Sequence, residues 1–210
     1  MKKVYFVRHG ESEGNVGGLR GHPDHPLTER GAQQATFIAK RCATLPITFL
    51  VSSTDRRARE TALAISQEIG MAPEYADLFV EARAPSALRG KSRSDPAVIA
   101  SQEEINKNFT IPGYHFADEE NFEDLNERAR KALVYLAERE EDEVLVVTHG
   151  FFMRMLAARA ILGDDLNAPA CQDFVRSLHM QNTGLSVFCY DASKEKPWWL
   201  WVWNDHAHLG

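Results

Sequence analysis

The chain has 210 residues, a length typical of one domain, and 44% of them are hydrophobic while 26% are charged. That apolar content is enough for a sizeable core and excludes an intrinsically disordered chain. The formal net charge of -6 argues against a general nucleic-acid-binding surface, but it leaves room for a local pocket of arginines that binds a small anion.

The cysteines and the apolar runs indicate the cellular compartment. Cys42, Cys171 and Cys189 are scattered, odd in number and include no CxxC pair, which is the pattern of reduced thiols in the cytoplasm. The apolar run near the N-terminus ends at Arg8 and is too short for the core of a signal peptide. No apolar stretch approaches membrane-spanning length. We therefore expect a cytoplasmic protein that does not bind membranes.

The first eighty residues alternate short β-rich runs with segments of helical periodicity. Thr28 is a suitable N-cap for the first helix, and Gly70 ends the second. The predicted elements are a strand at 3–7, a glycine- and proline-rich loop at 10–26, a helix over 32–45, a strand at 47–51, a helix over 56–70 and a short strand at 78–80.

Residues 83–121 differ in composition, because they are rich in proline and glycine and mix both signs of charge. We interpret them as an insertion with one short helix around 96–106, and we expect this insertion to cover the active site and to choose the substrate. Its basic side chains include Arg83, Arg89, Lys91 and Arg93. Each is either a solvated loop residue or a contact for a second anionic group, and we assign Arg83 to substrate binding.

The rest of the chain returns to regular elements. These are a helix over 122–140, a strand at 143–147, a helix over 150–163, and a final strand pair at 185–190 and 198–203. The alternation predicts one domain over 1–210, an α/β sandwich with a largely parallel sheet. In such folds the loops that leave the carboxyl ends of the strands form the active site. His9 and His149 each follow a strand directly, so we expect them to lie side by side.

The residues around the two histidines favour an anion over a metal ion. Arg8 precedes His9, and a fixed cation repels a metal ion, whereas a guanidinium group matches the oxygens of phosphate. Arg57 lies at the predicted start of a helix, where free backbone N–H groups also attract an anion. Arg56 and Arg59 point elsewhere on that helix and are expected to be solvated. The sequence thus predicts a phosphate pocket without a metal ion.

A neutral imidazole in such a pocket can attack phosphorus and form a phosphohistidine. The surrounding cations stabilise charge on the equatorial oxygens during in-line transfer. An acid must protonate the leaving oxygen, and Glu81, directly after the run at 78–80, is the best-placed carboxylate. The alternative interpretation of Glu81 is a surface residue at the end of a strand.

Four motifs, taken in chain order, make the sequence resemble a known family. They are RHGES followed by Asn15, PLTERGAQQA, SSTDRRARETA and VVTHG, and the closing WVWNDHAHL adds to them. Over nearly the whole chain, this set resembles the histidine phosphatase superfamily, the phosphoglycerate mutase-like proteins. The resemblance implies a three-layer α/β/α sandwich with a mixed, mostly parallel central sheet. It implies no metal and no organic cofactor.

The resemblance also implies a role for each residue of the motifs. His9 is the nucleophile that becomes phosphorylated, and Glu81 corresponds in position to the proton donor. Arg8, Arg57 and His149 clamp the phosphoryl group, and Asn15 and the Gly150 amide assist. We add Ser12 and Arg83 to the residues that we expect to bind the substrate.

Departures from the family's mutases favour the phosphatase branch. Cofactor-dependent phosphoglycerate mutases carry a tryptophan where this chain has Gly14. After the acid they carry a tyrosine-glycine pair and a lysine, which are missing from residues 82–86. The glycine-tryptophan-glutamate-glycine segment of many phosphatase members is absent as well. We expect hydrolysis of a phosphate monoester in a small molecule, with a phosphoprotein as a variant. The alternatives are a mutase-type phosphotransferase and a non-catalytic module that binds phosphorylated ligands.

Other histidines and tryptophans have simpler interpretations. Four histidines lack further ligands in their neighbourhood and are expected to be loop residues: His22, His25, His206 and His208. The tryptophans that alternate along 198–203 suit core packing, or contact in a homodimer, better than a stacking platform for sugars or bases. The turn at 182–184 either lies near the site or only connects two elements.

Overall fold

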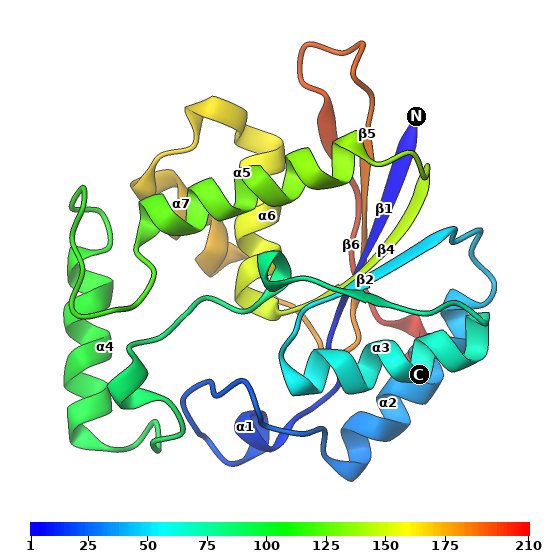
Figure 1. The fold of residues 1–210 in the computed structure, drawn as a ribbon. Coiled ribbons are helices and arrows are strands. Elements are labelled where there is room, and N and C mark those ends of the chain that lie inside the picture. The colour runs from blue at the N-terminus through cyan, green and yellow to red at the C-terminus, as the bar shows by residue number, and fades with distance from the viewer.

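A computed structural model describes residues 1–210 and places six strands in one sheet, in the order β3-β2-β4-β1-β5-β6 (Figure 1). The strands are β1 (Lys2–Arg8), β2 (Phe49–Ser52), β3 (Glu74–Tyr75), β4 (Glu143–Thr148), β5 (Leu185–Tyr190) and β6 (Trp198–Asp205). The first four run parallel to one another, whereas β5 is antiparallel to both β1 and β6. The predicted mixed, mostly parallel sheet is therefore confirmed.

Helices cover both faces of this sheet, as the three-layer prediction requires. They are α1 (Glu13–Val16), α2 (Glu29–Cys42), α3 (Arg56–Ile69), α4 (Pro96–Asn108), α5 (Phe122–Glu138), α6 (Gly150–Leu162) and α7 (Ala168–Ser177). Helices α2 and α3 pack on one face, and α5 and α6 pack on the other. Helix α4 belongs to the 83–121 segment and stands away from the sheet (Figure 1).

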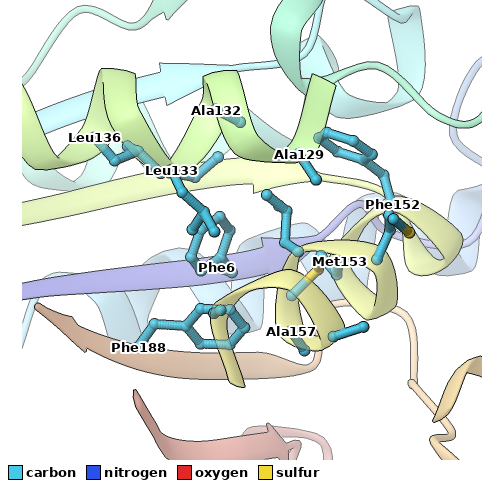
Figure 2. Close-up of a cluster of buried hydrophobic side chains, with 14 of the residues drawn as sticks. Phe6, Ala129, Ala132, Leu133, Leu136, Phe152, Met153, Ala157 and Phe188 are labelled. Atoms are coloured by element: carbon cyan, nitrogen blue, oxygen red, sulfur yellow. The ribbon is translucent and has the colours of Figure 1, made fainter. Parts of the chain in front are cut away.

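The alternation of side chains along β1 explains why both faces need a helical layer. Val4 and Phe6 belong to the core under α5 and α6, whereas Tyr5 and Val7 belong to the core under α2 and α3. The rings of Phe6 and Phe188 lie 4.8 Å apart in the first of these cores (Figure 2). Because β1 is central and apolar on both faces, the position of its carboxyl end is fixed firmly.

Two predicted helix ends are confirmed in atomic detail. The Thr28 side chain accepts a hydrogen bond of 3.0 Å from the Gly31 N–H group and so caps α2. Gly70 ends α3 with φ at 68°, in the left-handed region that glycine adopts at little cost.

The predicted strand at 78–80 is wrong. A 3-10 turn spans Asp77–Phe79 instead, and the strand beside β2 is β3, which lies a few residues earlier. The apolar run reflects burial without strand pairing, because Phe79 is fully buried in the core and Val80 is only 8% exposed. Arg128 of α5 donates to the carbonyl groups of Leu78 and Val80, at 3.2 and 2.8 Å, so these groups are not available to a neighbouring strand.

The sequence analysis also missed α7, between α6 and β5. Asn167 caps this helix by accepting a hydrogen bond of 3.0 Å from the Ala170 N–H group, and a proline lies in its first turn. This N-cap with a following proline is a signal that was available in the sequence. No helix of this structure combines the length and the apolar character that crossing a membrane requires.

Candidate active site

The two predicted histidines meet at one edge of the sheet. β1 and β4 are neighbours in parallel register, with Arg8 opposite Thr148, and His9 and His149 follow them directly. The His9 N–H group donates to the Thr148 carbonyl at 3.0 Å. The two imidazole rings are buried, with their centroids 5.0 Å apart. The expectation that these side chains lie side by side is met.

The His9 ring is held in one tautomer. Its Nδ1 atom lies 2.7 Å from the Gly10 carbonyl oxygen, which can only accept, so Nδ1 carries the proton. Nε2 then has a free lone pair and accepts a hydrogen bond of 3.2 Å from Nε of Arg57. Burial, together with the nearby Arg57 and Arg8 guanidinium groups, holds the pKa of His9 well below its ordinary value. The ring is therefore neutral, with a nucleophilic nitrogen beside a cation.

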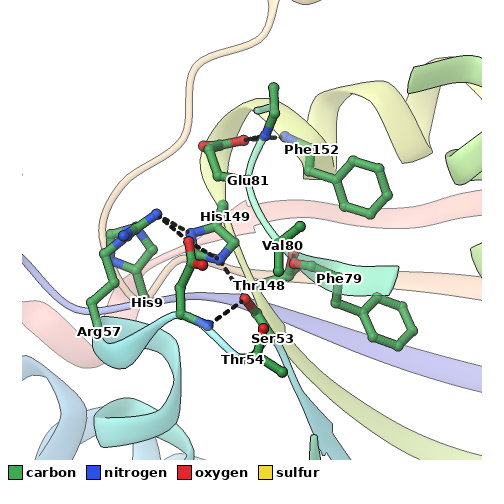
Figure 3. A network of polar contacts seen from close by, with 12 residues as sticks. His9, Ser53, Thr54, Arg57, Phe79, Val80, Glu81, Thr148, His149 and Phe152 are labelled. Atoms are coloured by element: carbon green, nitrogen blue, oxygen red, sulfur yellow. Dashed lines mark hydrogen bonds and ion pairs between the residues drawn. The ribbon is translucent and has the colours of Figure 1, made fainter. Parts of the chain in front are cut away.

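Arg57, in the first turn of α3, connects both histidines and an acid (Figure 3). Its Nη2 atom donates to Asp55 Oδ2 at 2.7 Å and to Nδ1 of His149 at 3.0 Å, and its Nη1 atom donates to the His22 carbonyl at 3.0 Å. The guanidinium group is thereby fixed from three sides. Burial raises the pKa of Asp55, although the charge of Arg57 opposes that effect.

His149 faces two polar groups that the sequence analysis did not single out. Its Nε2 atom lies 2.8 Å from the Ser53 hydroxyl oxygen and 3.4 Å from Asp55 Oδ2. Since Arg57 donates to Nδ1, the proton of the neutral ring sits on Nε2. Burial lowers the pKa of His149 well below its ordinary value, and Arg57 adds to the effect. The motif SSTDRRARETA held the signal for both partners, because each precedes Arg57 by a few residues.

Arg8 lines the same site from the end of β1. Its Nη1 atom donates to the Met180 carbonyl, whereas its Nε atom is buried without a partner. Burial lowers the pKa of Arg8, and the charge of Glu81 counters this. A Cβ atom at Gly150 would lie 3.1 Å from Nε of Arg8, so the glycine leaves the guanidinium group its room. This contact is a physical reason for the second His-Gly pair.

Glu81 lies at the N-terminus of α6, whose N-cap residue is His149 (Figure 3). Its Oε1 atom accepts from the N–H groups of Phe152 and Ala82, at 3.0 and 2.9 Å, and its Oε2 atom accepts from Phe151 N–H at 3.2 Å. The carboxyl group lines the cavity that His9 also lines. Glu81 is therefore half-buried beside the site and is not a free surface residue.

The loop after β1 brings in Ser12 and Asn15. Asn15 Oδ1 accepts from the Ser12 N–H and hydroxyl groups, at 3.1 and 3.2 Å, and from Asn182 Nδ2 at 3.3 Å. Asn182 Nδ2 also donates to the His9 carbonyl at 3.0 Å. Thr183, at a φ of 58°, donates from its N–H group to the Arg8 carbonyl at 3.0 Å. Of the two interpretations of the 182–184 turn, the one near the site is correct.

A cavity of about 700 Å³ opens over these groups, a size typical of small-molecule sites. Seven arginines line it: Arg8, Arg20, Arg57, Arg83, Arg93, Arg154 and Arg176. Three acids do so as well: Glu81, Glu119 and Glu120. Three of the seven arginines, Arg20, Arg154 and Arg176, were missed by the sequence analysis. Arg89 and Lys91, which it grouped with Arg83 and Arg93, are not among the lining residues.

The 83–121 segment supplies one wall of this cavity, through Arg83, Arg93 and parts of α4. Its two ends are joined, because the Arg83 N–H group donates to Glu120 Oε2 at 2.9 Å and the Glu120 N–H group donates to the Arg83 carbonyl at 3.1 Å. Arg128 then anchors Glu120 from α5 through two hydrogen bonds, of 2.6 and 2.7 Å.

The remaining predictions concern residues outside the site or at its rim. The rings of His22 and His25 lie 5.6 Å apart, and no group of three or more potential metal ligands exists in the structure. His25 lines the cavity, and His208 Nε2 lies 3.0 Å from the Thr183 hydroxyl oxygen. Of the alternating tryptophans, Trp203 packs against the core and is only partly buried, whereas Trp201 is 63% exposed on the edge strand β6, so core packing explains them only in part.

Comparison with known proteins identifies the family of the chain. The model of the histidine phosphatase superfamily (branch 1) matches residues 4–206. The chain belongs to the histidine phosphatase superfamily. Relatives within it include the probable phosphoglycerate mutase GpmB of Citrobacter koseri, 32% identical over 218 residues, and that of Photorhabdus laumondii, 31% identical over 220 residues. In both cases the match covers 100% of this chain and 95% of the relative.

Solved structures of other proteins share the fold. YhfR of Bacillus stearothermophilus superposes with a TM-score of 0.81, is 26% identical, and matches over 100% of both chains. A mycobacterial glucosyl-3-phosphoglycerate phosphatase, solved with inorganic phosphate, gives a TM-score of 0.80 over 100% of both chains, at 20% identity. At 20% identity, the similarity to the mycobacterial phosphatase shows a shared fold only.

Proposed function

We propose that the protein is a phosphatase that hydrolyses a phosphate monoester through a phosphohistidine on His9. The observation that carries the proposal is the state of the His9 ring, which is neutral and presents the Nε2 lone pair beside Arg57. A neutral nitrogen is a nucleophile toward phosphorus, and the nearby guanidinium groups stabilise the phosphoryl oxygens during transfer. Neither step requires a metal ion or an organic cofactor.

The proposed reaction has two displacements at phosphorus. In the first, the Nε2 lone pair of His9 forms a bond to phosphorus while the P–O bond to the substrate breaks, and Glu81 gives a proton to the leaving oxygen. In the second, water attacks phosphorus, the Nε2–P bond breaks, and Glu81 takes up a proton from the water. Inorganic phosphate then leaves. Oε2 of Glu81, with its single hydrogen bond of 3.2 Å, is the oxygen better placed to carry this proton.

A mutase is the second candidate, because the relatives at 31 and 32% identity are named probable phosphoglycerate mutases. The loop after β1 argues against it. A Cβ atom at Gly14 would lie only 2.3 Å from Nδ1 of His25, so the tryptophan that the family's mutases carry there does not fit unless the His25 side chain moves. We therefore place hydrolysis first.

The experiment that tests the proposal is phosphate release from p-nitrophenyl phosphate and a panel of phosphorylated metabolites, with a chelator present. We expect metal-independent release by the wild-type protein and none by His9→Ala, whose fold is checked by circular dichroism. Activity retained in His9→Ala would refute the proposal. Interconversion of phosphoglycerates that depends on a bisphosphate primer would favour the mutase. Phosphate binding without any turnover would favour a non-catalytic module.

A further inference from the structure

Most of the arginines in the cavity have no carboxylate partner. Arg57 is paired with Asp55, but the other six lining arginines form no ion pair. The three lining acids are engaged elsewhere. Glu81 accepts backbone N–H groups of α6, and Glu120 is paired with Arg128. Glu119 accepts the N–H groups of Phe116 and Ala117, at 2.6 and 2.8 Å. The cavity therefore has more cationic groups than one phosphoryl group requires.

Two of these unpaired arginines, Arg20 and Arg93, are brought together by a backbone pairing between two loops. Leu19 and Ser92 form an isolated antiparallel bridge. The Arg20 N–H group donates to the Lys91 carbonyl at 2.8 Å. The Arg93 N–H group donates to the Gly18 carbonyl at 2.7 Å. The pairing joins the loop after β1 to the 83–121 segment and places both guanidinium groups on one wall.

The two side chains are poorly satisfied by the protein itself. The Arg20 guanidinium group donates no hydrogen bond, and its Nε atom is buried without a partner. Arg93 uses only Nε, which donates to the Leu19 carbonyl at 3.1 Å. Burial lowers the pKa of Arg20, the charge of Arg93 adds to this, and Glu119 opposes it. Two like charges that lack an ion-pair partner are unfavourable unless a ligand supplies the negative charge.

We propose that Arg20 and Arg93 form a second anion site, and that the substrate is a phosphate monoester with a second anionic group, either a carboxylate or a phosphate. The inference rests on the proposed function, because Arg8, His9 and Arg57 are taken to hold the phosphate that is removed. Arg20 comes from the loop after β1 and Arg93 from the 83–121 segment. The second group is bound only when these two segments are paired. The two arginines contact this group and not the reacting phosphate, so they determine specificity and are not catalytic residues.

Matched pairs of probe substrates test the proposal. 3-Phosphoglycerate and glycerol 3-phosphate have the same phosphate ester, but the first carries a carboxylate where the second carries a hydroxymethyl group. Fructose 1,6-bisphosphate and fructose 6-phosphate differ in a second phosphate. We expect one of the doubly anionic members to be preferred about tenfold or more in kcat/KM, because hydrogen bonds to charged groups carry that much discrimination. The pair that shows the preference identifies the second group.

Variants assign the preference to the two arginines. In Arg20→Gln and in Arg93→Gln we expect the preference to fall to near one, and in Arg20→Lys to fall in part. Lys91→Gln is the matched control, since it removes the same charge from the same loop pairing but does not line the cavity, and it should keep the wild-type ratio. Equal kcat/KM values within both pairs for the wild-type protein, or a preference unchanged in both Gln variants, would overturn the proposal.

Binding measurements separate this proposal from the phosphatase assignment. Dissociation constants for the same pairs are measured by titration calorimetry on His9→Ala, in which no turnover is expected. Tighter binding of a doubly anionic member without turnover in the wild type would support the second anion site and overturn the phosphatase. Turnover by the wild type, with equal binding of both members of each pair, would support the phosphatase and overturn the second anion site.

Discussion

Arg128 and Glu120 form a doubly hydrogen-bonded ion pair, with Nε to Oε1 at 2.6 Å and Nη2 to Oε2 at 2.7 Å, and each side chain is only 9% exposed. The same guanidinium group donates to the carbonyls of Leu78, Val80 and Glu81 and lies 3.9 Å from the ring centre of Phe152. The pair thus joins α5, the 83–121 segment and the chain around Glu81.

Removal of one partner of this pair leaves the other as an uncompensated buried charge. We expect Arg128→Met and Glu120→Gln each to lower the free energy of unfolding by about 3–5 kcal/mol, measured by urea denaturation. Arg130→Met is the control on the same helix, because its ion pair with Glu127 is exposed, and little change is expected. An equally small effect at Arg128 would contradict the buried-pair interpretation.

The activity of Arg128→Lys tests whether Arg128 positions Glu81 in the proposed reaction. An alkyl phosphate needs a proton on its leaving oxygen, whereas p-nitrophenolate leaves without one. We expect kcat for an alkyl phosphate to fall about tenfold more than kcat for p-nitrophenyl phosphate. A tenfold loss is smaller than the full contribution of a general acid, because Glu81 itself is still present. Equal losses on both substrates would show a structural effect only.

The buried histidines predict how stability depends on pH. In the folded protein the pKa values of His9 and His149 lie well below the ordinary 6.5, so both rings are neutral. Above pH 6.5 they are neutral in the unfolded chain as well, and their contribution does not change with pH. As the pH falls below 6.5, the unfolded chain binds protons that the folded chain does not, so the stability falls. Each ring contributes up to about 1.4 kcal/mol per pH unit in that window.

Denaturant unfolding between pH 8 and pH 5 measures this slope. The contribution of these two rings to the free energy of unfolding of the wild-type protein should be nearly independent of pH down to about pH 6.5. Below that value its free energy of unfolding should decline, and the decline should be shallower in His149→Gln. The same slope in both proteins would mean that other groups cause the acid sensitivity.

Gly150 predicts a change in activity with little change in fold. A Cβ atom there would lie 3.1 Å from Nε and 3.4 Å from Cδ and Cζ of Arg8, so Gly150→Ala should displace the guanidinium group. We expect weaker binding of inorganic phosphate and a lower kcat/KM by roughly tenfold, as for the loss of a charged hydrogen bond. Unchanged affinity for inorganic phosphate in Gly150→Ala would show that the guanidinium group tolerates the added methyl group.

The homodimer stays a prediction, and the position of Trp201 shows where to test it. Trp201 is 63% exposed on β6, and β6 is an edge strand of the sheet. If the dimer forms there, Trp201→Ser should shift the mass measured by analytical ultracentrifugation from dimer to monomer. A monomeric mass for the wild-type protein would dispose of the prediction.

The sequence was sufficient for the strands that deliver the two histidines. β1 and β4 are short β-rich runs that are buried on both faces, so their sequence pattern alone predicts strands at these positions. Because the two strands pair in parallel, His9 then lies beside His149. Arg57 was found because a helix start is marked locally. These parts of the site depend on information that lies within about ten residues of each functional group.

Other parts depend on contacts across the chain, which a local pattern does not contain. The run at 78–80 looks like a strand, but Arg128, about fifty residues away, takes its carbonyl groups. Arg20 gains its position only through the pairing of its loop with residues 90–93. Asp55 is different, because its place two residues before Arg57 was a local signal that the sequence analysis passed over.

The joined ends of the 83–121 segment also bear on how such a protein can diverge. Arg83 and Glu120 are held together by two hydrogen bonds, so the residues between them leave and rejoin the scaffold at one point. A replacement of different length or composition, closed by the same two residues, would leave the sheet and both histidines where they are. The two histidines and the part of the cavity wall that residues 83–121 supply are therefore encoded in separate stretches of the gene, and selection can change one while it conserves the other.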